Sequence, residues 1–117
     1  MLEKEIEAKL KKGVEKLGGR CYKFVSPGNS GVPDRLILLP GGACAFAELK
    51  APGKKERKLQ AHIQEQIREL GFIVFSSVDS EERIDEVLRW ASSRMRATRS
   101  AAKAPGTEVD NGALYPA

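Results

Sequence analysis

Apolar side chains recur every three or four residues in three segments of the chain, a spacing that places them on one face of a helix. The three stripes are Leu2, Ile6, Leu10, Val14 and Leu17; Leu59, Ile63, Ile67 and Leu70; and Ile84, Val87, Leu88 and Ala91. Gly18 and Gly71 follow the first two stripes, and glycine favours the end of a helix. Ser80 precedes the third stripe and is a suitable N-cap residue. The pattern therefore predicts three amphipathic helices.

Short apolar runs bounded by turn residues predict four strands between these helices. The runs are 21–25, 35–39, 43–49 and 72–75, and the segment Pro40-Gly41-Gly42 forms a tight turn between the second and the third. The predicted order is αβββαβα. Because a helix connects the third and fourth strands, a crossover is possible and these strands are expected to be parallel. The fold class is α/β, with a mixed β-sheet flanked by helices.

The apolar pattern fades after Trp90, and residues 93–117 are rich in Ala, Ser, Gly and Pro. We therefore expect one domain over residues 1–92 and a flexible C-terminal tail over residues 93–117. The amino terminus lacks the apolar stretch of a secretory signal, and no apolar run reaches the ~20 residues that cross a bilayer. A cytoplasmic location is expected, with Cys21 and Cys44 as reduced, buried thiols.

Two acids and a lysine lie at the ends of the second and third predicted strands. A hairpin centred on residues 40–42 pairs Asp34 with Glu48, and Lys50 lies on the same strand face as Glu48. Two carboxylates at close range repel each other and favour a cation between them. Oxygen ligands point to Mg²⁺ or Mn²⁺, which can support phosphodiester hydrolysis.

The alternative reading is that Asp34 begins a turn and that Glu48 and Lys50 form a solvated strand face. The apolar residues on either side of Glu48 predict a buried strand, and burying a lone carboxylate is costly. This cost and the convergence of the three residues favour a site.

The segment GVPDRLILLPGG, followed by FAELKAPG, resembles the PD-(D/E)XK nuclease superfamily. More narrowly, it is similar to the VRR-Nuc family, as found in small stand-alone phage and bacterial proteins. Pro33, Asp34, Glu48, Leu49 and Lys50 match the core motif in order and spacing, and the likeness extends over residues 2–90. The resemblance implies a restriction-endonuclease-like core.

The resemblance also implies roles for individual residues. Asp34 and Glu48 would bind the metal with the Leu49 carbonyl, and Lys50 would orient or activate water. Gln60 matches a glutamine near the site of such nucleases, although it is also explained as an ordinary exposed helix residue. Glu3 is the preferred additional acid from the first helix, and Glu7 is the alternative. The single histidine, His62, is expected on a helix surface.

Basic residues follow the predicted site directly. Lys54, Lys55, Arg57 and Lys58 adjoin Lys50 with one acid, Glu56, among them. Such a run is often only a solvated face, but its place beside the site favours contact with phosphates. Lys23 and the loop 26–31, including Ser30, are further candidates for contact with the nucleic-acid backbone. The net charge of +4 is mild support for a polyanionic partner.

The sequence is thus interpreted as a Mg²⁺- or Mn²⁺-dependent DNA endonuclease without an organic cofactor or membrane attachment. The resemblance implies a homodimer that cuts branched DNA, with Holliday-junction resolution as the first substrate hypothesis. A nicking, restriction-like or helicase-associated nuclease remains an alternative. A basic DNA-binding module without catalysis is the alternative from another class.

Overall fold

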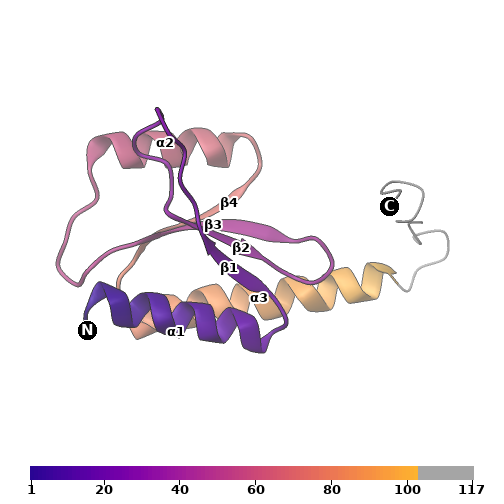
Figure 1. The fold of residues 1–117 in the computed structure, drawn as a ribbon. Coiled ribbons are helices and arrows are strands. Elements are labelled where there is room, and N and C mark those ends of the chain that lie inside the picture. Colours follow the sequence, from indigo (N-terminus) through magenta and orange to yellow (C-terminus); the bar gives the residue numbers. More distant parts are fainter. Residues whose placement is uncertain (103–117) are drawn as a thin grey trace.

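Four strands and three helices make up the part of the chain that the computed structural model describes, residues 1–102, with side chains described as far as residue 97. The elements are α1 (Glu3–Lys16), β1 (Arg20–Lys23), β2 (Arg35–Leu38), β3 (Cys44–Leu49), α2 (Lys58–Glu69), β4 (Ile73–Val78) and α3 (Glu81–Ala102). Their order confirms the prediction from the apolar pattern (Figure 1).

The sheet is mixed, with strand order β1-β2-β3-β4. The pairs β1–β2 and β2–β3 are antiparallel. The pair β3–β4 is parallel, because α2 carries the chain back across the sheet between these two strands. In Figure 1, α1 and α3 lie together on one face of the sheet and α2 lies on the other. The fold is therefore the α/β arrangement that the sequence predicted.

The main core lies between the sheet and the pair α1 and α3. Its buried residues include Ile6, Leu10, Val14, Ile37, Leu49, Val78, Val87 and Ala91. The predicted apolar stripes of the first and third helices supply five of these eight residues. The other three lie on strands, where alternate side chains point to this face. This core holds β2 and β3 in place, and these strands carry the candidate site.

The predicted apolar stripe of α2 does not form a buried face. Leu59 and Leu70 remain 48% and 76% exposed, whereas Gln60 and Gln64 are the residues that α2 buries. The reason is tertiary: α2 packs mainly on β4, and at this end the sheet presents the polar side chains of Glu48 and Ser76 to it. Amide side chains can pair with these groups and leucines cannot.

The third helix is longer than the apolar pattern indicated. It continues past Trp90 to Ala102, so the predicted domain boundary at residues 92 and 93 falls inside α3. Met95 packs against the core, which explains why the helix extends beyond the fading stripe. Residues 103–117 of the predicted tail lie outside the described residues. None of the helices within residues 1–102 is long and apolar enough to span a membrane.

Smaller differences concern the strand ends and the cysteines. The first strand ends at Lys23 rather than Val25, although the Phe24 N–H still donates to the Asp34 carbonyl. The fourth strand extends to Val78 with a bulge, where Ser77 has a φ of 49°. Both cysteines are free, with Cys21 buried and Cys44 half-buried.

Candidate active site

The hairpin of β2 and β3 brings the predicted acids together. Arg35 pairs with Ala47 and Leu38 with Cys44, which is the register expected for a turn at residues 40–42. Asp34, directly before β2, therefore faces Glu48 near the end of β3. Pro33 before it is fully buried, so the start of the strand is anchored in the protein.

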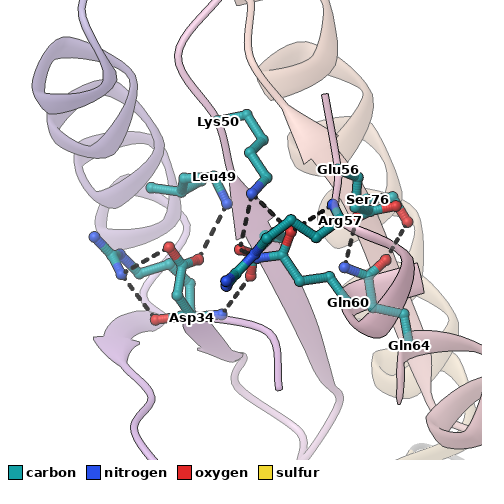
Figure 2. A network of polar contacts seen from close by, with 10 residues as sticks. Asp34, Leu49, Lys50, Glu56, Arg57, Gln60, Gln64 and Ser76 are labelled. Atoms are coloured by element: carbon teal, nitrogen blue, oxygen red, sulfur yellow. Dashed lines mark hydrogen bonds and ion pairs between the residues drawn. The ribbon is translucent and has the colours of Figure 1, made fainter. Parts of the chain in front are cut away.

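The two acidic residues are joined by reciprocal hydrogen bonds (Figure 2). The backbone N–H of Asp34 donates to Glu48 Oε2 over 3.0 Å. The backbone N–H of Leu49 donates to Asp34 Oδ1, also over 3.0 Å. Each carboxylate is thus oriented by a main-chain N–H from the opposite side of the hairpin.

Lys50 and Gln60 complete this group from β3 and the first turn of α2. Lys50 Nζ donates to Gln60 Oε1 over 2.9 Å and lies 3.7 Å from Glu48 Oε1. Gln60 Nε2 donates to Glu48 Oε1 over 2.9 Å. Gln60 is buried, so the reading of it as an ordinary exposed helix residue is wrong. Its amide links the lysine to the acid and holds α2 against the site.

Burial makes ionisation of both carboxyl groups costly. Burial and, to a smaller extent, the charge of Asp34 raise the pKa of Glu48 to about 7, although the charge of Lys50 opposes the shift. Burial also raises the pKa of Asp34, against the lowering effects of the Leu49 hydrogen bond and the Arg35 charge. A divalent cation would favour the ionised form of both groups.

The donor set fits a hard cation with open coordination positions. Within residues 1–102, no group of three or more His, Cys, Asp and Glu side chains is arranged to hold a metal ion. Two carboxylates, completed by a carbonyl group and by water, suit Mg²⁺ or Mn²⁺, which keep several waters when they bind to proteins. Asp34 and Glu48 therefore fit such an ion, and ligation by the Leu49 carbonyl stays a prediction.

Arg35 is a member of this site that the sequence did not single out. Its side chain is 7% exposed. Arg35 NH1 donates to the Asp34 carbonyl over 2.8 Å and lies 3.5 Å from Asp34 Oδ2. Arg35 NH2 pairs with Glu7 Oε2 at 2.9 Å, which connects α1 to the site. An arginine inside a short apolar strand, next to the motif aspartate, is the signal that could have identified it.

The same contacts distinguish the two acids considered on α1. Glu7 is engaged by Arg35, whereas the charge of Glu3 raises the pKa of Asp34. Glu3 thus acts electrostatically on the site from α1, and its catalytic role stays a prediction.

We expect Arg35→Met to lower the free energy of unfolding by about 2 kcal/mol, because it removes the buried guanidinium that donates to the Asp34 carbonyl and lies beside the Asp34 carboxylate. Cleavage by the folded variant should fall about tenfold, since Asp34 loses a neighbouring positive charge and a contact that orients it. Urea denaturation and cleavage rates measure the two effects. Glu7→Gln is the control, because Glu7 is half exposed and its loss should cost under about 1 kcal/mol. Unchanged stability and activity of Arg35→Met would remove Arg35 from the site.

The predicted nucleic-acid contacts lie around the same group. The basic segment is exposed: Lys54, Lys55 and Arg57 lie on the connection between β3 and α2, and Lys58 begins α2. Lys23 at the end of β1 and Ser30 in the loop after it are also exposed. The loop that contains Ser30 touches the start of α2: a Cβ added to Gly31 would lie 3.0 Å from Leu59 Cγ. This loop and the basic segment are therefore neighbours in space. His62 is exposed, as the sequence predicted.

A mixed sheet with an Asp–Glu–Lys group at a hairpin defines an α/β protein of the restriction-endonuclease-like class. No family model matches the chain. Over 79 residues, it is 48% identical to "Putative nuclease p44" of Acyrthosiphon pisum secondary endosymbiont phage 1, across 66% of this chain and 85% of that protein. A solved structure named "VRR_NUC domain" is 32% identical with a TM-score of 0.68, and the match covers 74% of this chain and 94% of that chain. The chain belongs to the VRR-Nuc family of nucleases.

Proposed function

We propose that this nuclease hydrolyses phosphodiester bonds in DNA with Mg²⁺ or Mn²⁺ held by Asp34 and Glu48. The observation that carries the proposal is the interlocked pair of the half-buried Asp34 and the buried Glu48, beside a lysine that is held by a buried glutamine. When bound, the cation would supply positive charge for the phosphate oxygens and a more acidic water molecule.

The other groups of the site have separate roles in this proposal. Lys50 directs an ammonium group toward the phosphate, where it stabilises the negative charge that builds up during hydrolysis and orients water. Gln60 accepts from Lys50 and donates to Glu48, so it fixes the distance between the positive and the negative group. These contacts hold the charged groups of the site in one arrangement, which is the positioning that the reaction needs.

The basic segment beside the site supports DNA backbone recognition. Its exposed cations suit phosphate contacts, because lysine carries its charge on a flexible side chain and arginine on a planar one. They are Lys54, Lys55, Arg57 and Lys58. Lys23 and Ser30 extend this surface in the proposal. Such contacts depend on backbone and shape rather than on base sequence. We propose that the protein acts in the cytoplasm, that of a bacterial host if the protein is phage-encoded.

A homodimer that cuts four-way junctions is the more specific part of the proposal. Exposed apolar side chains at α2 and the start of β4 could support self-association; they are Leu59, Leu70, Phe72 and Ile73. A two-fold dimer would present two sites to a symmetric junction. This arrangement explains why a small nuclease would prefer branched DNA to a linear duplex.

Cleavage of labelled DNA in Mg²⁺, Mn²⁺ or EDTA tests the proposal, with a four-way junction, a nicked duplex and a linear duplex as substrates. We expect paired cuts in the junction, no cleavage in EDTA, and a dimer mass by light scattering. Cleavage of linear duplex at an equal rate would favour the restriction-like or nicking alternative. DNA binding without cleavage in either metal would favour the basic module.

A further inference from the structure

Gln64 is a fully buried polar residue that the proposed chemistry does not use. It lies one helical turn after Gln60, on the same face of α2, and is 0% exposed. Gln64 Nε2 donates to Glu56 Oε1 over 2.6 Å, and Ser76 Oγ donates to Gln64 Oε1 over 2.5 Å (Figure 2). Burying an amide is costly unless both of its ends are paired, so these contacts have a structural purpose.

At Ser76, these hydrogen bonds reach strand β4 of the sheet. Arg68 NH2 donates to Ser76 Oγ over 2.6 Å and to the Val74 carbonyl over 3.0 Å. Ser76 and Val74 both belong to β4, which pairs with the strand that carries Glu48. A continuous set of hydrogen bonds therefore connects the sheet, through Gln64, to Glu56.

Glu56 belongs to the basic segment 54–58, which lies beside the site. Two buried glutamines, one turn apart, hold consecutive residues of this segment: Gln64 bonds the Glu56 carboxylate, and Gln60 Oε1 accepts the Arg57 N–H over 3.0 Å. Gln60 also contacts Glu48 and Lys50. The position of the basic segment is thus tied to the acidic pair through one face of α2.

We infer that Gln64 and Glu56 are positioning residues that clamp the basic segment 54–58 beside the site, so that its cations meet the phosphates of bound DNA. The inference rests on the proposed DNA substrate and adds a role for the single acid among the cations. The clamp costs some attraction for DNA, because Glu56 carries a negative charge. In return, the clamp stabilises the geometry in which the neighbouring cations can contact the DNA phosphates.

Two variants of Glu56 separate the effect of its charge on DNA binding from the effect of its contact with Gln64 on cleavage. Glu56→Gln removes the charge but keeps an oxygen that can accept from Gln64, so DNA affinity should rise about two- to fivefold with cleavage retained. Glu56→Ala removes both the charge and the clamp, so single-turnover cleavage should fall about tenfold. Gln64→Met keeps the charge and breaks the clamp, and it should lose cleavage like Glu56→Ala. If Glu56→Ala behaves like Glu56→Gln, the charge alone matters and the clamp is wrong.

Limited trypsin digestion tests the clamp without DNA. Trypsin cleaves after lysine and arginine, and the segment offers Lys54, Lys55, Arg57 and Lys58. We expect Glu56→Ala and Gln64→Met to be cut in this segment at least about fivefold faster than wild type, because local opening becomes easier. Glu56→Gln should resemble wild type.

Cleavage within α1 serves as the control, because it reports general unfolding instead of local release. Equal rates in the segment for all variants would overturn the inference. A wild-type protein that cuts no DNA would refute the proposed function, while the trypsin rates would still decide whether the clamp exists. Glu56→Ala alters a half-exposed side chain, so it remains informative if Gln64→Met fails to fold.

Discussion

Asp34→Asn and Lys50→Met are each expected to lower DNA cleavage by about 10³-fold while changing DNA affinity less than about tenfold. Asparagine at position 34 removes the charge that would bind a cation. Methionine at position 50 removes the ammonium group but keeps the length of the side chain. Binding should persist because the exposed cations of the segment 54–58 supply most of the phosphate contacts. Single-turnover cleavage and fluorescence anisotropy measure the two quantities.

The structure favours asparagine over alanine at position 34. Asp34 Oδ1 accepts the N–H of Leu49, a residue that is almost fully buried. Alanine would leave this N–H unpaired at a cost of about 1–3 kcal/mol, whereas asparagine retains an oxygen acceptor. Lys54→Met is the matched control for Lys50→Met, because it makes the same change at an exposed cation outside the acidic pair. Full activity of either site variant would remove that residue from the mechanism.

The stability of the metal-free protein should fall as the pH rises from 5 to 8. Burial raises the pKa of Glu48 to about 7 in the folded protein, above its ordinary value of 4.5. The folded state then binds the proton more tightly than the unfolded state. The stabilisation is complete below pH 4.5 and is lost as the pH passes through 7, up to about 3 kcal/mol for a shift of this size. Asp34, whose pKa is also raised, changes stability in the same direction.

Urea denaturation in EDTA at a series of pH values measures this effect, and Glu48→Gln is the variant that isolates it. The variant cannot titrate, so its stability should change much less over the same range, although one hydrogen bond to Gln60 or Asp34 is lost. Mn²⁺ at pH 8 should restore stability to wild type and not to Glu48→Gln. A wild-type curve that is flat between pH 5 and 8, or equal stabilisation of both proteins by Mn²⁺, contradicts the prediction.

The spacing of apolar residues was sufficient to predict the order of helices and strands and the hairpin that brings Asp34 to Glu48. These features depend on local periodicity and on one tight turn, both of which can be read over a few residues. The placement of Lys50 on the face of Glu48 follows from the alternation of a strand. The proximity of the acids and the lysine was therefore contained in the sequence, although their chemical roles stay predictions.

Burial on α2 was not contained in its periodicity. Leu59 and Leu70 follow the apolar period but remain exposed, while Gln60 and Gln64 are buried. The sheet region under α2 presents carboxylate and hydroxyl groups, and the glutamine amides form hydrogen bonds with them that leucines cannot form. A helix period identifies which residues share a face, but the surface that the helix meets determines which face is buried.

The sequence by itself determined the fold class, the strand order around the hairpin and the meeting of Asp34, Glu48 and Lys50, because each depends on neighbours along the chain. Only the tertiary structure decided that Arg35 links Asp34 to Glu7, that Gln64 holds Glu56, and that α3 runs to Ala102. The pair of Arg35 and Glu7 joins elements that are distant in sequence, and the length of α3 depends on packing against the core. The bond between Gln64 and Glu56 depends on the way in which α2 packs on β4. Their energies depend on burial and on partner geometry, and neither quantity is encoded in local spacing.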